Sequence, residues 1–232
     1  MNHKSAFWRK VWHDHARQNR RADPMTRVMR TRDGQPISAI QWKREANHIL
    51  RVAGVRSTDR VLELCCGNGA LTEELALRCQ SVVAVDYVSA LVAELREKSL
   101  PNVSCRCADA RQLTFSSEAF DVVLVCAGIQ YFTDTEAAKF VLDAFRWLKP
   151  GGRICLVDVP DNRKLWRYVR SNEKRRLYFG RILAGRQLVG TWYDERWFLN
   201  LADYVGYRSA KIIRQPSYMM NHFYRFDLLL KK

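Results

Sequence analysis

The chain has 232 residues, which is enough for one domain with a sizeable buried core. Its fractions of hydrophobic residues, 47%, and charged residues, 27%, are ordinary for a globular protein in water, and no apolar run is long enough to cross a bilayer. Charges and histidines near the N-terminus stand where a signal peptide needs an apolar stretch. The sequence therefore predicts a cytoplasmic protein without a transmembrane segment.

The seven cysteines have no zinc-site spacing, and most of them lie in or beside apolar strands. Their odd number fits a reducing compartment in which cysteines serve as small apolar fillers. We therefore predict neither a disulfide framework nor a metal site.

The net charge of +15 is unevenly distributed along the chain. Residues 1–60 carry 14 Lys and Arg against 5 Asp and Glu, giving +9, and residues 161–232 carry 16 against 6, giving +10. The middle, residues 61–160, carries 9 against 13, giving −4. Basic flanks favour solubility on one reading, and contact with an anionic partner on another.

The first elements along the chain are helical. A helix is expected over about 3–20, with Trp8, Trp12 and His15 on one face at helical spacing. A stretch punctuated by Pro and Gly follows over 23–36. A second helix is expected over about 38–53, with Ser38 as its N-cap and its end near Gly54.

Strands and helices alternate from residue 60 onward. Short apolar strands are expected at 61–64, 81–86, 102–107, 120–127 and 153–159, with helices over about 69–79, 88–99 and 134–148. Such alternation predicts parallel βαβ units, and near-continuous apolar strands indicate a sheet buried on both faces. The predicted fold class is therefore a doubly wound α/β sheet.

The end of the chain departs from this alternation. A basic helical stretch is expected over about 162–185 and a further helix over about 195–205. Two strands, within 207–215 and 222–232, then follow with little room for a crossover helix between them. We therefore expect an antiparallel closing pair that completes a mostly parallel, seven-stranded sheet.

The segment 61–72 carries the clearest motif. A strand ends in the turn Cys65-Cys66-Gly67-Asn68-Gly69, which opens a helix. Glycine lets backbone approach a ligand closely, and a helix N-terminus favours negative charge. A nicotinamide or flavin fingerprint would require a third glycine where Thr72 stands, so the motif disfavours a dinucleotide site.

At this segment the chain resembles the class I S-adenosylmethionine-dependent methyltransferase family, of the bacterial small-molecule type. The family's first motif runs acidic-x-Gly-x-Gly-x-Gly, and this sequence offers Glu63 through Gly69 with Cys65 in place of the first glycine. A residue with a Cβ is disfavoured there if the backbone needs positive φ.

Three further matches follow in the family's order. Asp86 ends the second strand, where the family places an acid on the ribose hydroxyls, and Asp109-Ala110 follows the third, where an acid lies near the adenine amino group. Leu148 through Gly152 form a turn that is frequent in the family. Singly, each acid could be a cap or turn residue, but their ordered spacing favours the resemblance. The cofactor residues it implies are Glu63, Cys65, Gly67, Asn68, Gly69, Asp86, Tyr87, Asp109, Ala110 and Cys126.

The loop after the fourth strand, 126–132, should face the transferred methyl group. It lacks the family's Asn/Asp-Pro-Pro-aromatic signature for base amino groups and the Pro-Cys setting of cytosine-ring enzymes. A hydroxyl acceptor needs a general base, whereas an amine must only arrive neutral. The candidate bases are His13, His15, His222 and Asp158. The residues we assign to catalysis are His15, Tyr131 and His222. The residues assigned to the substrate are Trp12, Gln130, Arg175, Arg176 and Tyr178.

The resemblance divides a single 1–232 methyltransferase domain into four parts. They are an N-terminal helical lid (1–54), a cofactor-binding core (55–160), a basic helical cap (161–206) and closing strands (207–232). The leading hypothesis is methyl transfer to N or O of an anionic small molecule or glycan, such as a nucleotide-linked or lipid-linked sugar; similarity to bacterial small-molecule enzymes, including the Tyr-Arg-Phe-Asp ending at 224–227, favours it. The alternatives are an RNA-modifying methyltransferase, which the charge favours, and a non-catalytic cofactor-binding partner subunit. Peripheral membrane contact stays open.

Overall fold

The fold is built around one seven-stranded sheet whose strand order is β5-β4-β3-β6-β7-β9-β8. The computed structural model describes residues 3–185 and 190–232. Five parallel strands, β3 to β7, account for one end and the middle of the sheet. None of the helices within the described ranges is long and apolar enough to span a bilayer.

The strands confirm the sequence-based expectation closely. Their bounds are β3 Arg60–Leu64, β4 Ser81–Asp86, β5 Val103–Cys107, β6 Phe120–Cys126, β7 Leu148–Pro160, β8 Ser209–Arg214 and β9 Arg225–Lys231. Strand β9 lies between β7 and β8 and is antiparallel to both, so the predicted antiparallel closing pair is confirmed. The register between β7 and β9 shifts between Leu156 and Val159, which marks an irregularity at Asp158.

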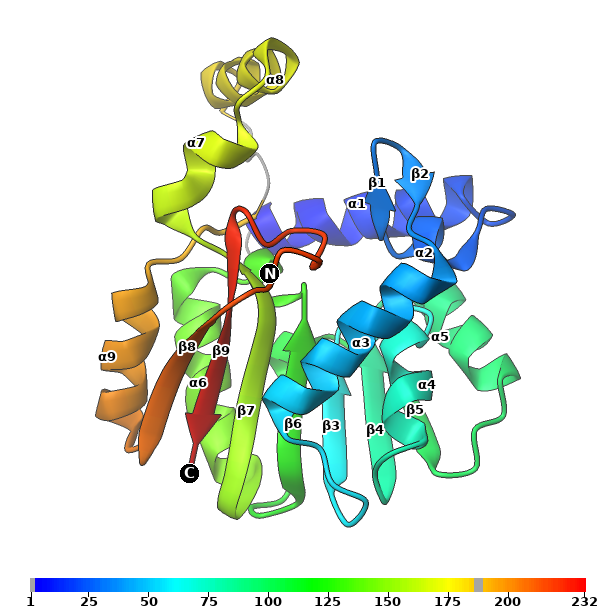
Figure 1. The fold of residues 1–232 in the computed structure, drawn as a ribbon, viewed down its shortest axis with the longest axis vertical. Helices are drawn as coiled ribbons and strands as arrows, with labels where there is room; N and C mark the ends of the chain where they lie inside the picture. Colours follow the sequence, from blue (N-terminus) through cyan, green and yellow to red (C-terminus); the bar gives the residue numbers. More distant parts are fainter. Residues whose placement is uncertain (1–2, 186–189) are drawn as a thin grey trace.

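Helices cover both faces of the sheet and bury its alternating side chains (Figure 1). Side chains of α3 (Ala39–Ala53) and α4 (Ala70–Ala76), with Leu95 of α5 (Ser89–Glu97), share a core cluster with one set of strand residues. Side chains of α6 (Asp134–Trp147) and α9 (Glu195–Val205) share another cluster with the opposite set, including Leu62 and Phe226. This three-layer architecture confirms the predicted fold class.

The N-terminal segment lies across the carboxyl ends of the parallel strands (Figure 1). It comprises α1 (His3–Gln18), the short α2 (Pro24–Arg27) and a hairpin of β1 (Thr31–Arg32) and β2 (Gln35–Pro36), which the sequence did not lead us to expect. Helix α3 follows with both predicted caps: Ser38 accepts from the amide of Gln41, and Gly54 ends the helix with φ 60°.

The segment after β7 rises above the same edge of the sheet. Helix α7 (Leu165–Tyr168) leads to α8 (Asn172–Leu183), which projects from the body and buries none of its side chains (Figure 1). Helix α9 then returns to the sheet and buries Phe198 and Ala202. The cap is therefore in contact with the body mainly through its two ends.

Truncation of a core side chain on β9 tests the closing pair. Phe226 is fully buried between the sheet and its helices. Phe226→Ala should lower the free energy of unfolding by about 3–5 kcal/mol, because it removes apolar contacts and leaves a cavity. Urea denaturation measures this change. Lys231→Ala, at the exposed end of the same strand, is the control, and a loss below about 1 kcal/mol in Phe226→Ala would contradict the packing described.

Candidate active site

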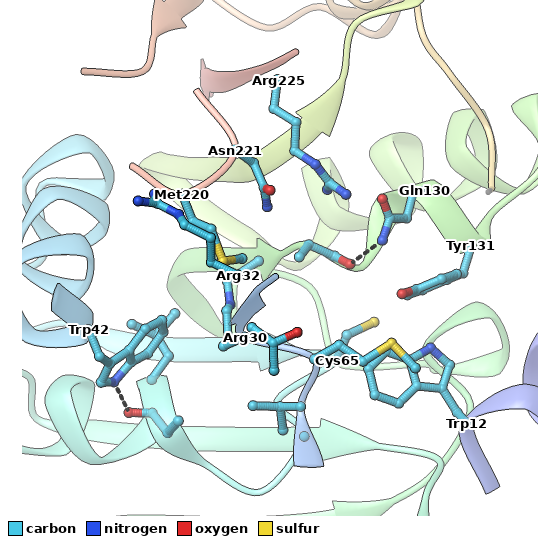
Figure 2. A pocket seen from close by; sticks show the side chains of 18 of the residues that line it. Trp12, Arg30, Arg32, Trp42, Cys65, Gln130, Tyr131, Met220, Asn221 and Arg225 are labelled. Carbon is cyan, nitrogen blue, oxygen red and sulfur yellow. Dashed lines mark hydrogen bonds between the residues drawn. The ribbon is translucent and has the colours of Figure 1, made fainter. Parts of the chain in front are cut away.

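A cavity of about 700 Å³ opens at the carboxyl ends of β3, β4 and β6 (Figure 2). Its floor is formed by the strand ends, and its walls come from the N-terminal segment, from the cap and from residues 217–225. Ligands of open α/β sheets bind at this edge, where loops from successive strands converge. The position and size of the cavity make it the candidate active site.

The turn after β3 has the backbone geometry of a glycine-rich motif. Cys65, Gly67 and Gly69 have φ values of 59°, 57° and 80°, so all three motif positions need the left-handed conformation. Cys65 adopts it despite its Cβ, at a cost of order 1–3 kcal/mol. A Cβ on Gly128 would lie 2.6 Å from the sulfur of Cys65, so the missing side chain at 128 leaves the room that Cys65 occupies.

Asp86, at the end of β4, is fixed by the backbone beside the cavity. Its carboxylate accepts hydrogen bonds from the amide of Gly67 at 3.0 Å and from that of Val88 at 2.9 Å. Burial raises the pKa of Asp86, and these amides act in the opposite direction because they stabilise the charged form. The carboxylate is therefore pre-positioned to accept hydrogen bonds from a ligand.

Glu63 lies in the floor of the cavity, almost fully buried. Burial raises the pKa of Glu63 to about 8, although the Thr72 hydroxyl donates to its carboxylate at 2.6 Å and acts to lower it. Near neutral pH, the carboxyl of Glu63 is therefore largely protonated in the ligand-free protein. A cationic ligand nearby would favour its ionised form.

Asp109 and Ala110 line a second, smaller cavity of about 20 Å³. This cavity adjoins the first, because Trp8, Cys65, Tyr87 and Tyr131 line both. The carboxylate of Asp109 is engaged by Arg111, at 2.8 Å from Nε, and by Arg9 of α1, at 3.3 Å from Nη2. Helix α1 therefore covers the predicted adenine acid.

Aromatic side chains of α1 close the cavity from above. The ring centroids of Trp8 and Trp12 lie 4.8 and 5.9 Å from that of Tyr131. His15 has both ring nitrogens engaged: Nε2 lies 3.0 Å from the carbonyl oxygen of Thr26, and Nδ1 lies 3.1 Å from the Asn19 amide nitrogen. His15 is thus held by its own segment and does not line either cavity.

A buried ion pair anchors the N-terminal segment to β7. Arg30 donates to the Asp158 carboxylate at 2.8 Å and to the sulfur of Cys126 at 2.9 Å. Burial acts to raise the pKa of Asp158, but Arg30 and Arg225 hold it below its usual value. Burial also raises the pKa of Cys126 to about 12, so Cys126 is a neutral thiol and not a nucleophilic thiolate.

The amide of Gln215 connects Asp158 to a second buried carboxylate. It donates to Asp158 at 2.9 Å and to Asp227 at 2.7 Å, and His48 lies 3.1 Å from Asp227. Arg225 enters the same region from β9 and donates to the carbonyl oxygen of Asp158. This network ties α3, β7 and β9 together beneath the far half of the cavity.

His222 lies in the wall formed by residues 217–225. Its Nδ1 is 2.9 Å from the carbonyl oxygen of Met219, so that nitrogen carries the proton and Nε2 retains its lone pair. Because His222 lines the cavity and its Nε2 has no hydrogen-bond partner among the described residues, its geometry suits a base better than that of His15 does.

The structure brings most of the sequence-predicted site residues to the main cavity. Those in its lining are Trp12, Glu63, Cys65, Gly67, Asn68, Asp86, Tyr87, Cys126, Gln130, Tyr131 and His222. Gly69 opens α4 behind the lining. Arg175, Arg176 and Tyr178 lie on α8 outside the lining, whereas their neighbours Arg170 and Lys174 contribute to it. A role of the α8 residues in substrate binding stays a prediction.

Several lining residues were not expected from the sequence. Arg30, Arg32 and Trp42 come from the N-terminal segment and α3, and Asn221 and Arg225 come from the C-terminal end. Arg30 and Arg225 are far apart in the chain, and each looks like one member of a basic flank. The available signal was Arg225 at the start of the strand 225–231, which continues into the apolar run 228–230, but the charge distribution concealed it.

Comparison with known proteins relates part of the chain to methyltransferases. A methyltransferase-domain model matches residues 61–152, the segment that carries the glycine-rich turn and Asp86. A demethylmenaquinone methyltransferase of Mycobacterium sp. (strain KMS) is 33% identical over 124 residues, which are 53% of this chain and 50% of that protein. Over residues 61–152 the chain therefore matches methyltransferase domains, as the resemblance of its motifs implies.

Two solved structures share the methyltransferase fold over nearly the whole chain. Phosphoethanolamine N-methyltransferase 1 of Haemonchus contortus, in complex with phosphoethanolamine and S-adenosylhomocysteine, has a TM-score of 0.68 at 17% identity over 98% of this chain and 48% of its own. DhpI, in a SAM–HEP complex, has a TM-score of 0.67 at 18% identity, over 100% of this chain and 99% of its own. The chain spans about half the length of the demethylmenaquinone methyltransferase that it matches.

The protonation of Glu63 makes cofactor affinity depend on pH. Because its pKa is raised to about 8, binding of the cationic S-adenosylmethionine should release a proton, and affinity should rise from pH 6 to pH 8 before levelling off. Calorimetry across this range, in buffers of different ionisation enthalpy, measures both effects. Glu63→Gln is the control for other titrations; the same pH profile in both proteins would show that Glu63 does not sense the bound charge.

Proposed function

We propose that this protein transfers the methyl group of S-adenosylmethionine to a nitrogen or oxygen atom of a small, anionic acceptor. The observation that carries the proposal is that the two ends of one cavity are lined by different kinds of residues. Glu63, Asp86 and the turn at Gly67 lie at the end formed by β3 and β4, while Arg225, Asn221 and His222 line the end formed by the C-terminal segment.

The β3–β4 end fits the cofactor. The carboxylate of Asp86 suits a ribose diol, since a carboxylate can accept from two hydroxyls, and the left-handed turn brings backbone amides to the ligand. Glu63 places a second acid where a sulfonium or ammonium group would favour its ionised form. When bound, the cofactor supplies an electrophilic methyl group on a positively charged sulfur.

The remaining residues position the acceptor and exclude water. Trp12 and Tyr131 close the cavity on the side of α1, which limits access of water to the reacting atoms. Transfer of that methyl group would require a lone pair of the acceptor to be held in line with it, which the lining residues would achieve by orienting the acceptor. Nε2 of His222 is the group that accepts the acceptor's proton.

The charge of the lining supports an anionic acceptor over a neutral one. Arg32, Arg170 and Lys174 join Arg225 around the cavity, and the structurally similar Haemonchus contortus enzyme is in complex with phosphoethanolamine, a compound of this charge class. Screening the protein with labelled S-adenosylmethionine against phosphorylated, carboxylated and neutral amines and alcohols tests the proposal. Equal turnover of the neutral compounds would contradict the assigned charge.

Removal of the carboxylate of Asp86 tests the cofactor end. Asp86→Ala should weaken S-adenosylmethionine binding by about 1.5–3 kcal/mol, because charge-assisted hydrogen bonds to the ribose are lost. Calorimetry measures the affinity, and Asp203→Ala, at an exposed position of α9, is the control. Unchanged affinity in a folded Asp86→Ala protein would remove the ribose assignment.

A further inference from the structure

Arg225 is a buried cation without an ion-pair partner among the residues that the structure describes. Arg225 is 7% exposed, and a terminal nitrogen of its guanidinium donates to the carbonyl oxygen of Asp158. Its Nε is buried without an acceptor. A buried guanidinium in this state is costly, because no described carboxylate lies within ion-pair distance of it and its Nε–H lacks an acceptor among the described residues.

The carboxylates nearby are already engaged by other groups. Asp158 is bound by Arg30 and Gln215, and Asp227 is bound by Gln215 and His48 and accepts from the amide of Asp158. Relief for Arg225 must therefore come from the cavity that it lines. Figure 2 shows its guanidinium pointing into the space between Asn221 and Gln130.

More positive charge surrounds the same end of the cavity. The Arg225 guanidinium lies 5.1 Å from the centroid of the Tyr224 ring; Tyr224 packs at 4.9 Å on Tyr168, and Lys174 lies 4.1 Å from the ring of Tyr168. Arg225 and Lys174 thus each contact one ring of a tilted pair. Two cations of this kind suit a doubly charged ligand better than a singly charged one.

We propose that Arg225, with Asn221 and Lys174, forms a cradle for the phosphate or phosphonate group of the methyl acceptor. Its fork-shaped guanidinium donates to two oxygens of that group, which supplies the acceptor that Nε lacks. This inference rests on the proposed function and adds the group by which the acceptor is held. It also fixes orientation: the phosphoryl end lies at β9 and the methylated atom lies toward β3.

Binding of small probes to the protein saturated with S-adenosylhomocysteine tests the cradle. Phosphoethanolamine and inorganic phosphate should bind, and acetate should bind at least about tenfold more weakly, since it offers one charge and two oxygens. Arg225→Gln should weaken phosphoethanolamine binding roughly 30-fold or more, because a buried charge pair is lost. Arg208→Gln, an exposed arginine outside the cavity, should leave binding unchanged.

The affinity for S-adenosylhomocysteine, measured in the same proteins, separates the two proposals. If the wild-type protein does not bind S-adenosylhomocysteine, the proposed function itself is overturned. If the wild-type protein does bind S-adenosylhomocysteine, three results overturn only the cradle. Phosphoethanolamine does not bind, Arg225→Gln binds it as tightly as the wild-type protein does, or acetate binds as tightly as phosphoethanolamine. Arg225→Lys keeps the charge and most of the packing, so it is the variant to measure if Arg225→Gln does not fold. If Arg225→Lys then binds phosphoethanolamine as tightly as the wild-type protein does, the contact of the guanidinium with two oxygens is overturned.

A second, independent feature is the apolar tip of the cap, which we define as Trp166, Leu177, Phe179, Ile182 and Leu183. Their side chains are between 48% and 88% exposed, and α8 buries none of its residues. Trp166 and Phe179 stack with ring centroids 6.1 Å apart, which joins the exposed apolar residues of α7 and α8 at this point. Exposed apolar clusters of this kind mark interaction sites.

The basic residues around this tip indicate which kind of partner it contacts. Arg167, Arg175 and Arg176 are exposed on the same two helices, and Glu173 is the one acid in the two helices. A second copy would bring like charges together, and RNA offers no apolar phase for Leu183 and its neighbours. We infer that the tip inserts into the interfacial region of a bilayer while the basic residues contact anionic headgroups.

Flotation with vesicles tests the membrane contact. Vesicles of phosphatidylcholine with roughly one-third phosphatidylglycerol should carry the protein, and the double variant Phe179→Glu, Leu183→Glu should reduce the bound fraction about fivefold or more. The matched control is Ile40→Glu, Tyr204→Glu, which changes two residues that are 83% and 85% exposed elsewhere. Absence of wild-type binding, or equal loss in both double variants, overturns the inference, whether or not the protein binds RNA or self-associates.

Discussion

The buried pair of Arg30 and Asp158 determines how the site is assembled. Arg30 follows the N-terminal helices, and Asp158 sits at the irregular end of β7, so their 2.8 Å contact joins the segment above the cavity to the sheet beneath it. Removing one partner of such a pair typically costs about 3–5 kcal/mol, since the other charge stays buried and unpaired. The position of the aromatic side chains of α1 over the cavity depends on this attachment.

Backbone strain is concentrated at the same edge of the sheet. Cys65, Ala127 and Asp158 have φ values of 59°, 53° and 61°, and they follow or end three neighbouring strands, β3, β6 and β7. Non-glycine residues adopt this conformation at a cost, and they persist where surrounding contacts fix them. Here those contacts include the bonds from Ala127 to the Val157 carbonyl and from the Asp158 amide to Asp227. The strain lies where a ligand needs close access to the backbone.

The sheet and its caps could be predicted from the sequence because their signals are local. Strand β4 and helix α9 have the expected bounds, and Ser38 and Gly54 cap α3 as their residue types indicate. The cofactor end was also accessible, since Glu63, Gly67 and Asp86 follow successive strands. The far end of the cavity could not be predicted from the sequence, because it joins Arg30 to residues more than a hundred positions away. Net charge predicted basic flanks but could not distinguish the buried Arg225 from Arg175 and Arg176 on the exposed α8.

The contact between Cys65 and Gly128 links the evolution of two loops. A Cβ at 128 would lie 2.6 Å from the sulfur of Cys65 and 2.7 Å from its Cβ, so only one of the two loops can carry a side chain in this space. Either position tolerates bulk only while the other lacks it, and the energetic effects of substituting both cannot be additive. A chain with glycine at 65 would have room for a side chain at 128, on the loop after β6. The departure from the family motif at Cys65 therefore restricts which residues can follow β6.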